Sequence, residues 1–161
     1  MNTHQAMDAL KAWFDKKNGR QSFAPKWVVF PELRLGAGYG PDVEQRLDVW
    51  AMNVWPSARE MVAVEIKVSR SDWKRELRKP TKRKLALFYS NRFYFAAPTG
   101  LIAAAELPAE CGLLEIADDG AVSIAVQAPW RDCHPPSWHF LGAIARRAAA
   151  MQGLWRKEDL R

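Results

Sequence analysis

Two neighbouring segments decide the fold: RLDVWAMNVW at residues 46–55 and EMVAVEIKVS at residues 60–69. In each segment apolar and polar residues alternate with period two, which is typical of a β-strand that buries one face. The residues between them, PSAR, have the composition of a turn. We therefore predict that the two segments form an antiparallel hairpin.

The register of this hairpin follows from its apolar faces. The residues expected on these faces are Leu47, Val49 and Ala51 in the first strand and Val62, Val64, Ile66 and Val68 in the second. Pairing apolar with apolar residues requires Val49 opposite Ile66, or a shift of two residues from that, because a slip of one turns every side chain to the other face. We expect Val49 opposite Ile66. Asp48 then lies opposite Lys67 and diagonal to Glu65.

Asp48, Glu65 and Lys67 would therefore meet on one polar face in the middle of a sheet. Charges in such a place are costly unless they are paired or bind a metal. Two carboxylates from adjacent strands suit a magnesium ion, and a nearby lysine can orient an attacking water or offset charge in the transition state. We predict a magnesium site. The alternative is a cross-strand salt bridge between Asp48 and Lys67, which would contribute little to stability.

This arrangement resembles the PD-(D/E)XK nuclease superfamily. The segments VEIKVSRSD (64–72), RFYFAAP (92–98) and LPAECGL (107–113) are similar to the small bacterial DNA-repair proteins of the MmcB-like group, and the resemblance covers roughly residues 28–126. It implies a restriction-endonuclease-like α/β core, a mixed β-sheet flanked by helices. It also implies magnesium-dependent hydrolysis of DNA phosphodiester bonds, with manganese as a substitute ion.

By motif position, the resemblance implies that Asp48 and Glu65 are metal ligands and that Lys67 is the catalytic lysine. Glu32 occupies the place of an upstream acid that some members add as a further ligand. The residue before Asp48 is leucine rather than proline, whereas a literal Pro-Asp pair ends at Asp42, in a glycine-rich loop. We prefer Asp48, and Asp42 is the alternative ligand if the hairpin is longer. This loop is followed by no helix, which excludes a Rossmann or P-loop phosphate site.

A run of basic residues follows the motif, with nine lysines and arginines and only two acids between positions 67 and 84. Because the run starts at the predicted metal site, we expect its cations to bind phosphates without reading the base sequence. A solvated helix face is the alternative. The predicted DNA contacts are Arg70, Lys74, Arg78, Lys79, Lys82, Arg83 and Lys84. Within the run, Trp73 is expected in the core, and Ser69 and Asp72 are weighed as residues around the site.

The rest of the pattern completes a single domain over residues 1–161, with a core at roughly 26–127 and the two terminal helices packing on it. The expected elements are a helix over Thr3–Lys17, a strand over 27–35 kinked at Pro31, a helix capped by Ser71 and interrupted at Pro80, a strand over Arg92–Ala97, a hairpin of Cys111–Ala117 with Val122–Val126, and a closing helix over Ser137–Met151 with Leu141, Ile144, Ala145 and Ala148 inward. This order predicts a mixed sheet.

Composition limits the function classes. No apolar run approaches the roughly 20 residues that cross a membrane, and the first residues do not resemble a secretion signal. Two cysteines, Cys111 and Cys133, cannot make a disulfide framework or a four-thiolate zinc site. The net charge of +6 favours a polyanionic partner. We expect a cytoplasmic, nucleoid-associated protein of bacterial or phage type that binds DNA and no membrane, with a homodimer as an option.

The expected function is a DNA endonuclease in repair, recombination or a mobile element. A non-catalytic nucleic-acid-binding protein on the same fold is the alternative, and the intact set of Asp48, Glu65 and Lys67 favours the enzyme.

Overall fold

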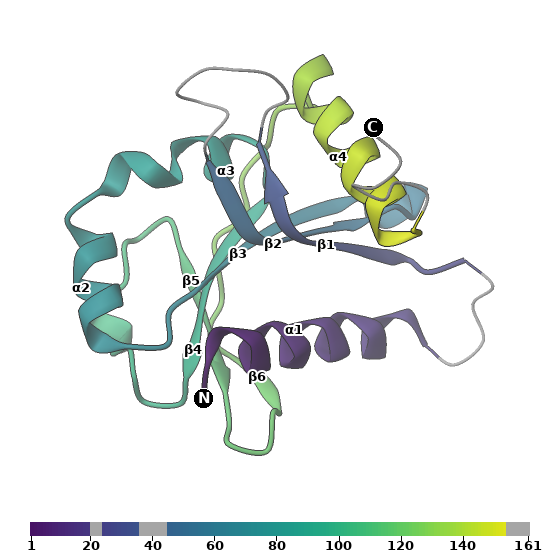
Figure 1. The fold of residues 1–161 in the computed structure, drawn as a ribbon. Coiled ribbons are helices and arrows are strands. Elements are labelled where there is room, and N and C mark those ends of the chain that lie inside the picture. The colour runs from purple at the N-terminus through teal and green to yellow at the C-terminus, as the bar shows by residue number, and fades with distance from the viewer. Residues whose placement is uncertain (20–23, 36–44, 154–161) are drawn as a thin grey trace, which may run out of the picture.

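The computed structural model describes residues 1–19, 24–35 and 45–153. These residues form a six-stranded mixed sheet flanked by four α-helices (Figure 1), which confirms the predicted α/β class. The elements in chain order are α1 (Thr3–Asn18), β1 (Trp27–Arg34), β2 (Arg46–Asn53), β3 (Glu60–Ile66), α2 (Arg70–Leu77), α3 (Lys84–Phe88), β4 (Arg92–Pro98), β5 (Gly112–Ile116), β6 (Val122–Val126) and α4 (Trp138–Met151). The spatial order of the strands is also β1 to β6.

The sheet changes strand direction at the site of interest. Strands β1, β2 and β3 are antiparallel, β3, β4 and β5 are parallel, and β6 is antiparallel to β5. The connection from β3 to its parallel neighbour β4 passes through α2 and α3. A parallel pair requires such a crossover, whereas β2 and β3 need only a tight turn. The end of β3 therefore lies where the hairpin stops and the crossover begins.

Helices cover both faces of the sheet. α1 lies on one face, and α3 and α4 lie on the opposite face (Figure 1). On the α1 face, Leu10 and Phe14 are buried in one apolar cluster with Val49 and Val64. The second cluster contains residues of α2, α3 and α4 together with the other sheet face. The apolar alternation of the strands is thus satisfied on both sides.

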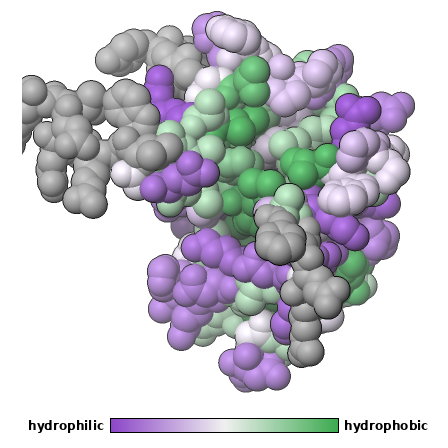
Figure 2. Space-filling model, turned by 90° about the vertical axis from the view of Figure 1, so that its right-hand side faces the viewer, coloured by the Kyte–Doolittle hydropathy of each residue, from purple (hydrophilic) through white to green (hydrophobic). Residues whose placement is uncertain are grey.

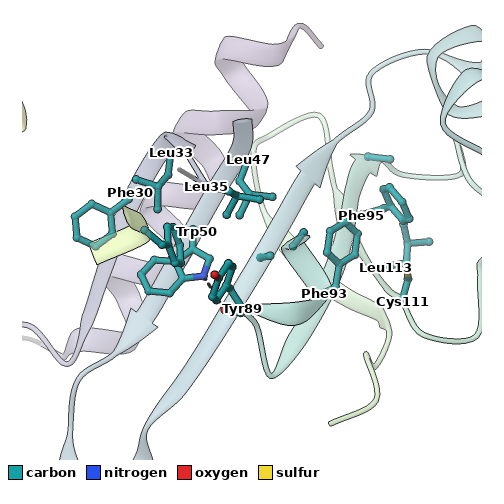
Figure 3. Close-up of a cluster of buried hydrophobic side chains, with 14 of the residues drawn as sticks. Phe30, Leu33, Leu35, Leu47, Trp50, Tyr89, Phe93, Phe95, Cys111 and Leu113 are labelled. Atoms are coloured by element: carbon teal, nitrogen blue, oxygen red, sulfur yellow. Dashed lines mark hydrogen bonds between the residues drawn. The ribbon is translucent and has the colours of Figure 1, made fainter. Parts of the chain in front are cut away.

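Aromatic side chains fill the second cluster (Figure 3). Trp50 is fully buried, and its indole Nε1 donates a hydrogen bond to the carbonyl oxygen of Tyr89 at 3.1 Å. Phe140 of α4 packs against both residues, with ring centroids 5.3 Å from Trp50 and 4.7 Å from Tyr89. The predicted core position of Trp73 is confirmed, since it is fully buried with its ring 4.8 Å from that of Phe95.

The hairpin register differs from the expected one by two residues. Val49 pairs with Val64, and β3 ends at Ile66 instead of continuing to residue 69. The next residue, Lys67, donates its backbone N–H to Ala96 on β4 at 2.9 Å, so the chain stays with β4 after it has left β2. A shift of two preserves the face of every side chain, so the predicted faces of β3 are correct although the offset is wrong.

Leu47 is an exception to the expected faces. It packs in the aromatic cluster with Leu33 and Leu35 (Figure 3). In contrast, Val49 and Ala51 belong to the α1 face. The neighbouring strand β1 is irregular at the same level, because Glu32 has a positive φ of 49°. The kink expected at Pro31 is therefore one residue later. Proline itself fits an edge strand, where its missing N–H faces no partner strand.

Two helices differ from prediction in detail. The cap of α2 is Ser69 rather than Ser71, since the Ser69 hydroxyl accepts the N–H of Asp72 at 3.2 Å. In α4 the buried positions are Phe140 and Ala143, with Ile144 and Ala148 packed beside them. The expected inward positions Leu141 and Ala145 are exposed instead, because Phe140 turns the helix face toward Trp50 and Tyr89.

The surface is not uniformly charged despite the net charge of +6. Figure 2 shows one face on which hydrophobic side chains gather between hydrophilic ones. Among the described residues, the most exposed large apolar side chain is that of Trp138, at 83% exposure. In the described part of the chain, no helix combines the length and the apolar character that a membrane span requires.

Candidate functional site

Asp48 stands on β2 at the point where β3 leaves the hairpin. Its carboxylate Oδ2 accepts the backbone N–H of Ile66 at 2.7 Å, so a side chain takes the place of a strand partner. Burial raises the pKa of Asp48 above its ordinary value, and the charges of Glu32 and Asp72 add to this effect. The hydrogen bond from Ile66 and the charge of Lys67 oppose it.

Glu65 and Lys67 form a tight pair on the same side of β3. The ammonium Nζ of Lys67 lies 3.0 Å from Glu65 Oε1 and 3.1 Å from Glu76 Oε2. Burial by itself would lower the pKa of Lys67, but the two carboxylates outweigh it and hold that pKa above its ordinary value. Lys67 is therefore a buried cation that is fixed in position by two acids.

Glu65 and Asp48 repel one another. Burial, and after it the negative charge of Asp48, raises the pKa of Glu65 to about 7, although Lys67 partly opposes the shift. The last pair of the β2–β3 ladder is Val49 with Val64, so the two acids lie one residue beyond it on adjacent strands. Within the described residues, Asp48 Oδ1 and Glu65 Oε2 have no hydrogen bond or ion pair. Two free carboxylate oxygens at one place are the kind of donor that a hard divalent cation requires.

Glu76 of α2 extends the network away from the sheet. It is 4% exposed, and its Oε1 lies 3.4 Å from Nη1 of Arg83, which is 5% exposed. Arg83 Nη2 lies 3.3 Å from Glu110 Oε1. Acids and bases thus alternate from Glu65 through Lys67, Glu76 and Arg83 to Glu110, which is the pairing that buried charges need.

The sequence prediction missed Glu76. A signal was present, because Glu76 follows Trp73 by three residues, and residues three apart share one face of a helix. Since Trp73 was expected in the core, its helical neighbour was a candidate for burial too.

A pocket of about 440 Å³ opens beside this network. The charged residues that line it are Arg46, Glu65, Glu76, Lys82 and Arg83. Its other walls come from apolar residues of the aromatic cluster, including Leu47 and Phe93. The polar face of the site is therefore reachable from outside, and both cations and carboxylates line the opening.

The predicted DNA contacts fall into three groups. Arg83 does not fit the expected surface contact, because it is buried and bound to Glu76 and Glu110. Arg70 is exposed, but its guanidinium forms two hydrogen bonds to Glu106, at 2.6 and 2.7 Å, and a third to a backbone carbonyl. The remaining five are exposed and form no ion pair with any described residue: Lys74, Arg78, Lys79, Lys82 and Lys84.

The other predicted site residues lie further from the pair of acids. Glu32 is exposed, with Oε1 4.0 Å from Arg46 Nη1, and it acts on Asp48 only through its charge. No group of three or more acidic, histidine or cysteine side chains suited to one metal occurs within residues 1–19, 24–35 and 45–153. Asp72 pairs with Arg75 at 3.2 Å. The alternative ligand, Asp42, lies outside the described residues.

Comparisons with known proteins add a likeness in fold. No protein-family model matches the sequence, and no curated protein matches it. A similar solved structure is that of a protein of unknown function from Silicibacter pomeroyi, with a TM-score of 0.61 and 24% sequence identity. The match covers 94% of this chain and 92% of that chain. At this identity the likeness shows the fold alone.

Proposed function

We propose that this chain is a magnesium-dependent nuclease that hydrolyses phosphodiester bonds of DNA. The observation that carries the proposal is the placement of Asp48 and Glu65 at one level of adjacent strands, each with a free carboxylate oxygen, beside the buried ammonium of Lys67. Two acids and a lysine in this relation match the residue types that metal-dependent phosphodiester hydrolysis requires.

The donor set fits a magnesium ion. Asp48 and Glu65 would hold it, and their mutual repulsion, which raises the pKa of Glu65, would be relieved by its charge. Magnesium is usually bound by one or two carboxylates and keeps several waters, so a third protein ligand is not required. A bound ion would neutralise negative charge on the phosphate. Manganese, which also prefers oxygen ligands, is expected to substitute.

Lys67 would act on the reacting groups. A lysine ammonium has three N–H donors, and two of these face Glu65 and Glu76. One donor is left to hydrogen-bond a water or a phosphate oxygen. Because the two carboxylates fix the ammonium, it requires no reorganisation to stabilise negative charge that develops on the phosphate.

The exposed cations after the motif would bind the substrate. Lys82 lines the same pocket as Glu65, and Lys79 precedes it on the exposed segment between α2 and α3. Lysines bind phosphates as point charges and do not read the base sequence. We therefore propose a nucleoid-associated, cytoplasmic protein of DNA repair, recombination or a mobile element, with a homodimer where two strands are cut.

A second candidate is a non-catalytic nucleic-acid-binding protein. It is favoured by the fact that Lys67 is neutralised by two carboxylates, because a buried ion network of this kind also occurs as a purely structural feature. The two candidates differ in one measurable property, the metal-dependent loss of intact DNA.

The test incubates the purified chain with labelled single-stranded, duplex, nicked, flap and junction DNA in magnesium, manganese or EDTA. We expect cleavage that requires the metal, and we expect Asp48→Asn and Glu65→Ala to abolish it. Lys67→Ala should still bind metal, but its turnover rate should fall by about a hundredfold or more. Asp118→Asn, in the exposed β5–β6 turn, is the matched control and should cleave normally. Activity that persists in Glu65→Ala would exclude the site, and wild-type binding without cleavage would favour the second candidate.

A further inference from the structure

We propose that an arginine-lined pocket between α4 and the β1–β2 ladder binds the phosphodiester backbone of a nucleic-acid strand. We call it the arginine pocket and define it by Arg34, Arg46, Arg146 and Arg147. The inference rests on the proposed function only for the identity of its ligand as the substrate strand. None of these arginines belongs to the basic run from which the DNA contacts were predicted.

Three elements build the arginine pocket. Arg34, the last residue of β1, pairs with Arg46, the first residue of β2, so the two side chains leave one end of the ladder. Arg146 and Arg147 come from α4, which packs against β1. The space between them is about 460 Å³, and small alanines of α4 form part of its wall. Such a space can accept a phosphate group and the adjoining sugar.

Among the described residues, little acidic charge balances the arginines of the pocket. The only acid among its lining residues is Glu32, whose Oε1 lies 4.0 Å from Arg46 Nη1. Arg34, Arg146 and Arg147 form no ion pair or side-chain hydrogen bond with the described part of the chain. Like charges at short range repel, so a gathering of unpaired guanidinium groups favours an anion. Guanidinium also binds phosphate with two parallel hydrogen bonds.

Arginines with a structural role look different in this protein. Arg92 Nε donates to Glu60 at 2.9 Å, and Arg131 donates to the backbone carbonyl of Glu110. Arg147 is half-buried like these two, and its Nε is enclosed without any acceptor among the described residues, as Arg131 Nη1 also is. Unlike Arg92 and Arg131, however, Arg147 makes no side-chain hydrogen bond or ion pair with any described residue. A buried donor without an acceptor costs free energy, which a bound anion would recover.

The arginine pocket shares one lining residue with the pocket at the candidate site. Arg46 also lines the pocket that contains Glu65 and Lys82. The cations are spread over β1, β2, α4 and the segment before α3 rather than converging on one point. An extended polyanion fits this distribution better than a single small phosphate, because it can contact successive cations and release counterions at each. A strand held by Arg146 and Arg147 would therefore be led toward Glu65.

The test compares two double variants that remove the same charge. Arg146→Gln with Arg147→Gln empties one wall of the arginine pocket. Lys26→Gln with Arg59→Gln removes two exposed cations at the opposite end of the β1–β2–β3 ladder. Affinity for a fluorescein-labelled oligonucleotide is measured as single-stranded DNA, duplex DNA and RNA, across a salt series and in EDTA. Thermal unfolding confirms that each variant is folded. A third double variant, Arg34→Gln with Arg46→Gln, tests the contribution of the two strand arginines to the affinity independently.

We expect the α4 variant to bind single-stranded DNA about tenfold more weakly than the ladder-end variant, and the slope of log affinity against log salt to fall by about 1.4, the value for two lost contacts. Equal losses in both variants, unchanged affinity in the α4 variant, or no nucleic-acid binding by the wild type would overturn the inference. Because EDTA removes catalysis, the two proposals fail separately. If the α4 variant loses affinity but the wild type never cleaves DNA, the pocket proposal stands and the nuclease proposal fails. If the wild type cleaves DNA but the α4 variant binds normally, the nuclease proposal stands and the pocket proposal fails.

Discussion

Glu76 holds two buried cations in place. Its two carboxylate oxygens face Lys67 and Arg83, at 3.1 and 3.4 Å. The fixed position of the Lys67 ammonium beside Glu65 thus depends on a residue of α2 that the motif does not include. Removing one partner of a buried ion pair destabilises a protein by more than the intact pair stabilises it, because the remaining charge stays buried without a partner.

Glu76→Ala should therefore lower the free energy of unfolding by about 3 kcal/mol. Glu76→Gln should lower it less, since the amide oxygen can still accept a hydrogen bond. Urea unfolding followed by circular dichroism gives the values. Asp118→Ala, at an exposed turn, is the control and should change stability by about 0.5 kcal/mol or less. Wild-type stability in Glu76→Ala would mean that the network does not form in the folded protein.

The raised pKa of Glu65 predicts a pH dependence of stability. Burial and the charge of Asp48 raise this pKa from 4.5 to about 7, so between those values the folded protein holds a proton that the unfolded chain has released. This contribution to stability is therefore lost as the pH rises through the interval. Glu65→Gln stays neutral, so its free energy of unfolding should rise relative to that of the wild type between pH 5 and pH 8, by about 3 kcal/mol at most. Urea unfolding in EDTA measures the difference, and a difference that does not change with pH would contradict the assignment.

The start of α2 joins the end of β3 to the ion network. Ser69 caps this helix through its hydroxyl, and the first helical residue, Arg70, is tied to Glu106 by two hydrogen bonds. These contacts orient α2 so that Glu76, near the other end of the helix, reaches Lys67. A cap that is worth about 1 kcal/mol thus acts on the geometry of the site as well as on the helix.

Ser69→Ala should destabilise the protein by about 1 kcal/mol, because it leaves the backbone N–H of Asp72 without its acceptor. Ser71→Ala is the matched control, since this exposed serine contacts only the Ser69 hydroxyl and caps nothing. Its effect should stay within about 0.5 kcal/mol. Chemical denaturation of both variants decides between them, and equal losses would contradict the cap.

The whole molecule brings the two acids together through one sheet. Asp48 comes from the antiparallel part of the sheet, whereas Glu65 belongs to a strand that is paired with β2 on one side and with β4 on the other. Without a metal ion, the folded state holds these two acids near each other with only the ammonium of Lys67 to offset their repulsion. An ion that binds only the folded arrangement stabilises the whole chain by mass action.

Magnesium chloride should therefore raise the melting temperature of the wild type. At ten times its dissociation constant, the ion adds about 1.4 kcal/mol, which corresponds to a shift of about 3–6 °C for a chain of this size. Asp48→Asn should lose most of the shift, and Asp118→Asn should keep it. Differential scanning fluorimetry against matched sodium chloride measures it. A similar shift in wild type and Asp48→Asn would place the ion elsewhere.

The alternating pattern of residues 62–66 was enough to predict the strand and its apolar face, and its pairing with residues 46–55 predicted that Asp48 and Glu65 meet in a hairpin. These are local properties, since side-chain direction follows the period wherever a strand is regular, as it is in β3 but not at Leu47 of β2. The offset could not be predicted, because pairing Val49 with Val64 or with Ile66 satisfies the same apolar pattern.

Burial of the charges was decided only by the tertiary structure. Sequence spacing placed Arg83 among surface cations, but the packing of α2 and α3 against the sheet encloses it with Glu76. The arginine pocket likewise joins the consecutive strands β1 and β2 to α4, which is far from them in the chain. Local patterns determine which face of an element is apolar, whereas contacts between distant charges depend on how those elements pack, and that is a property of the whole fold.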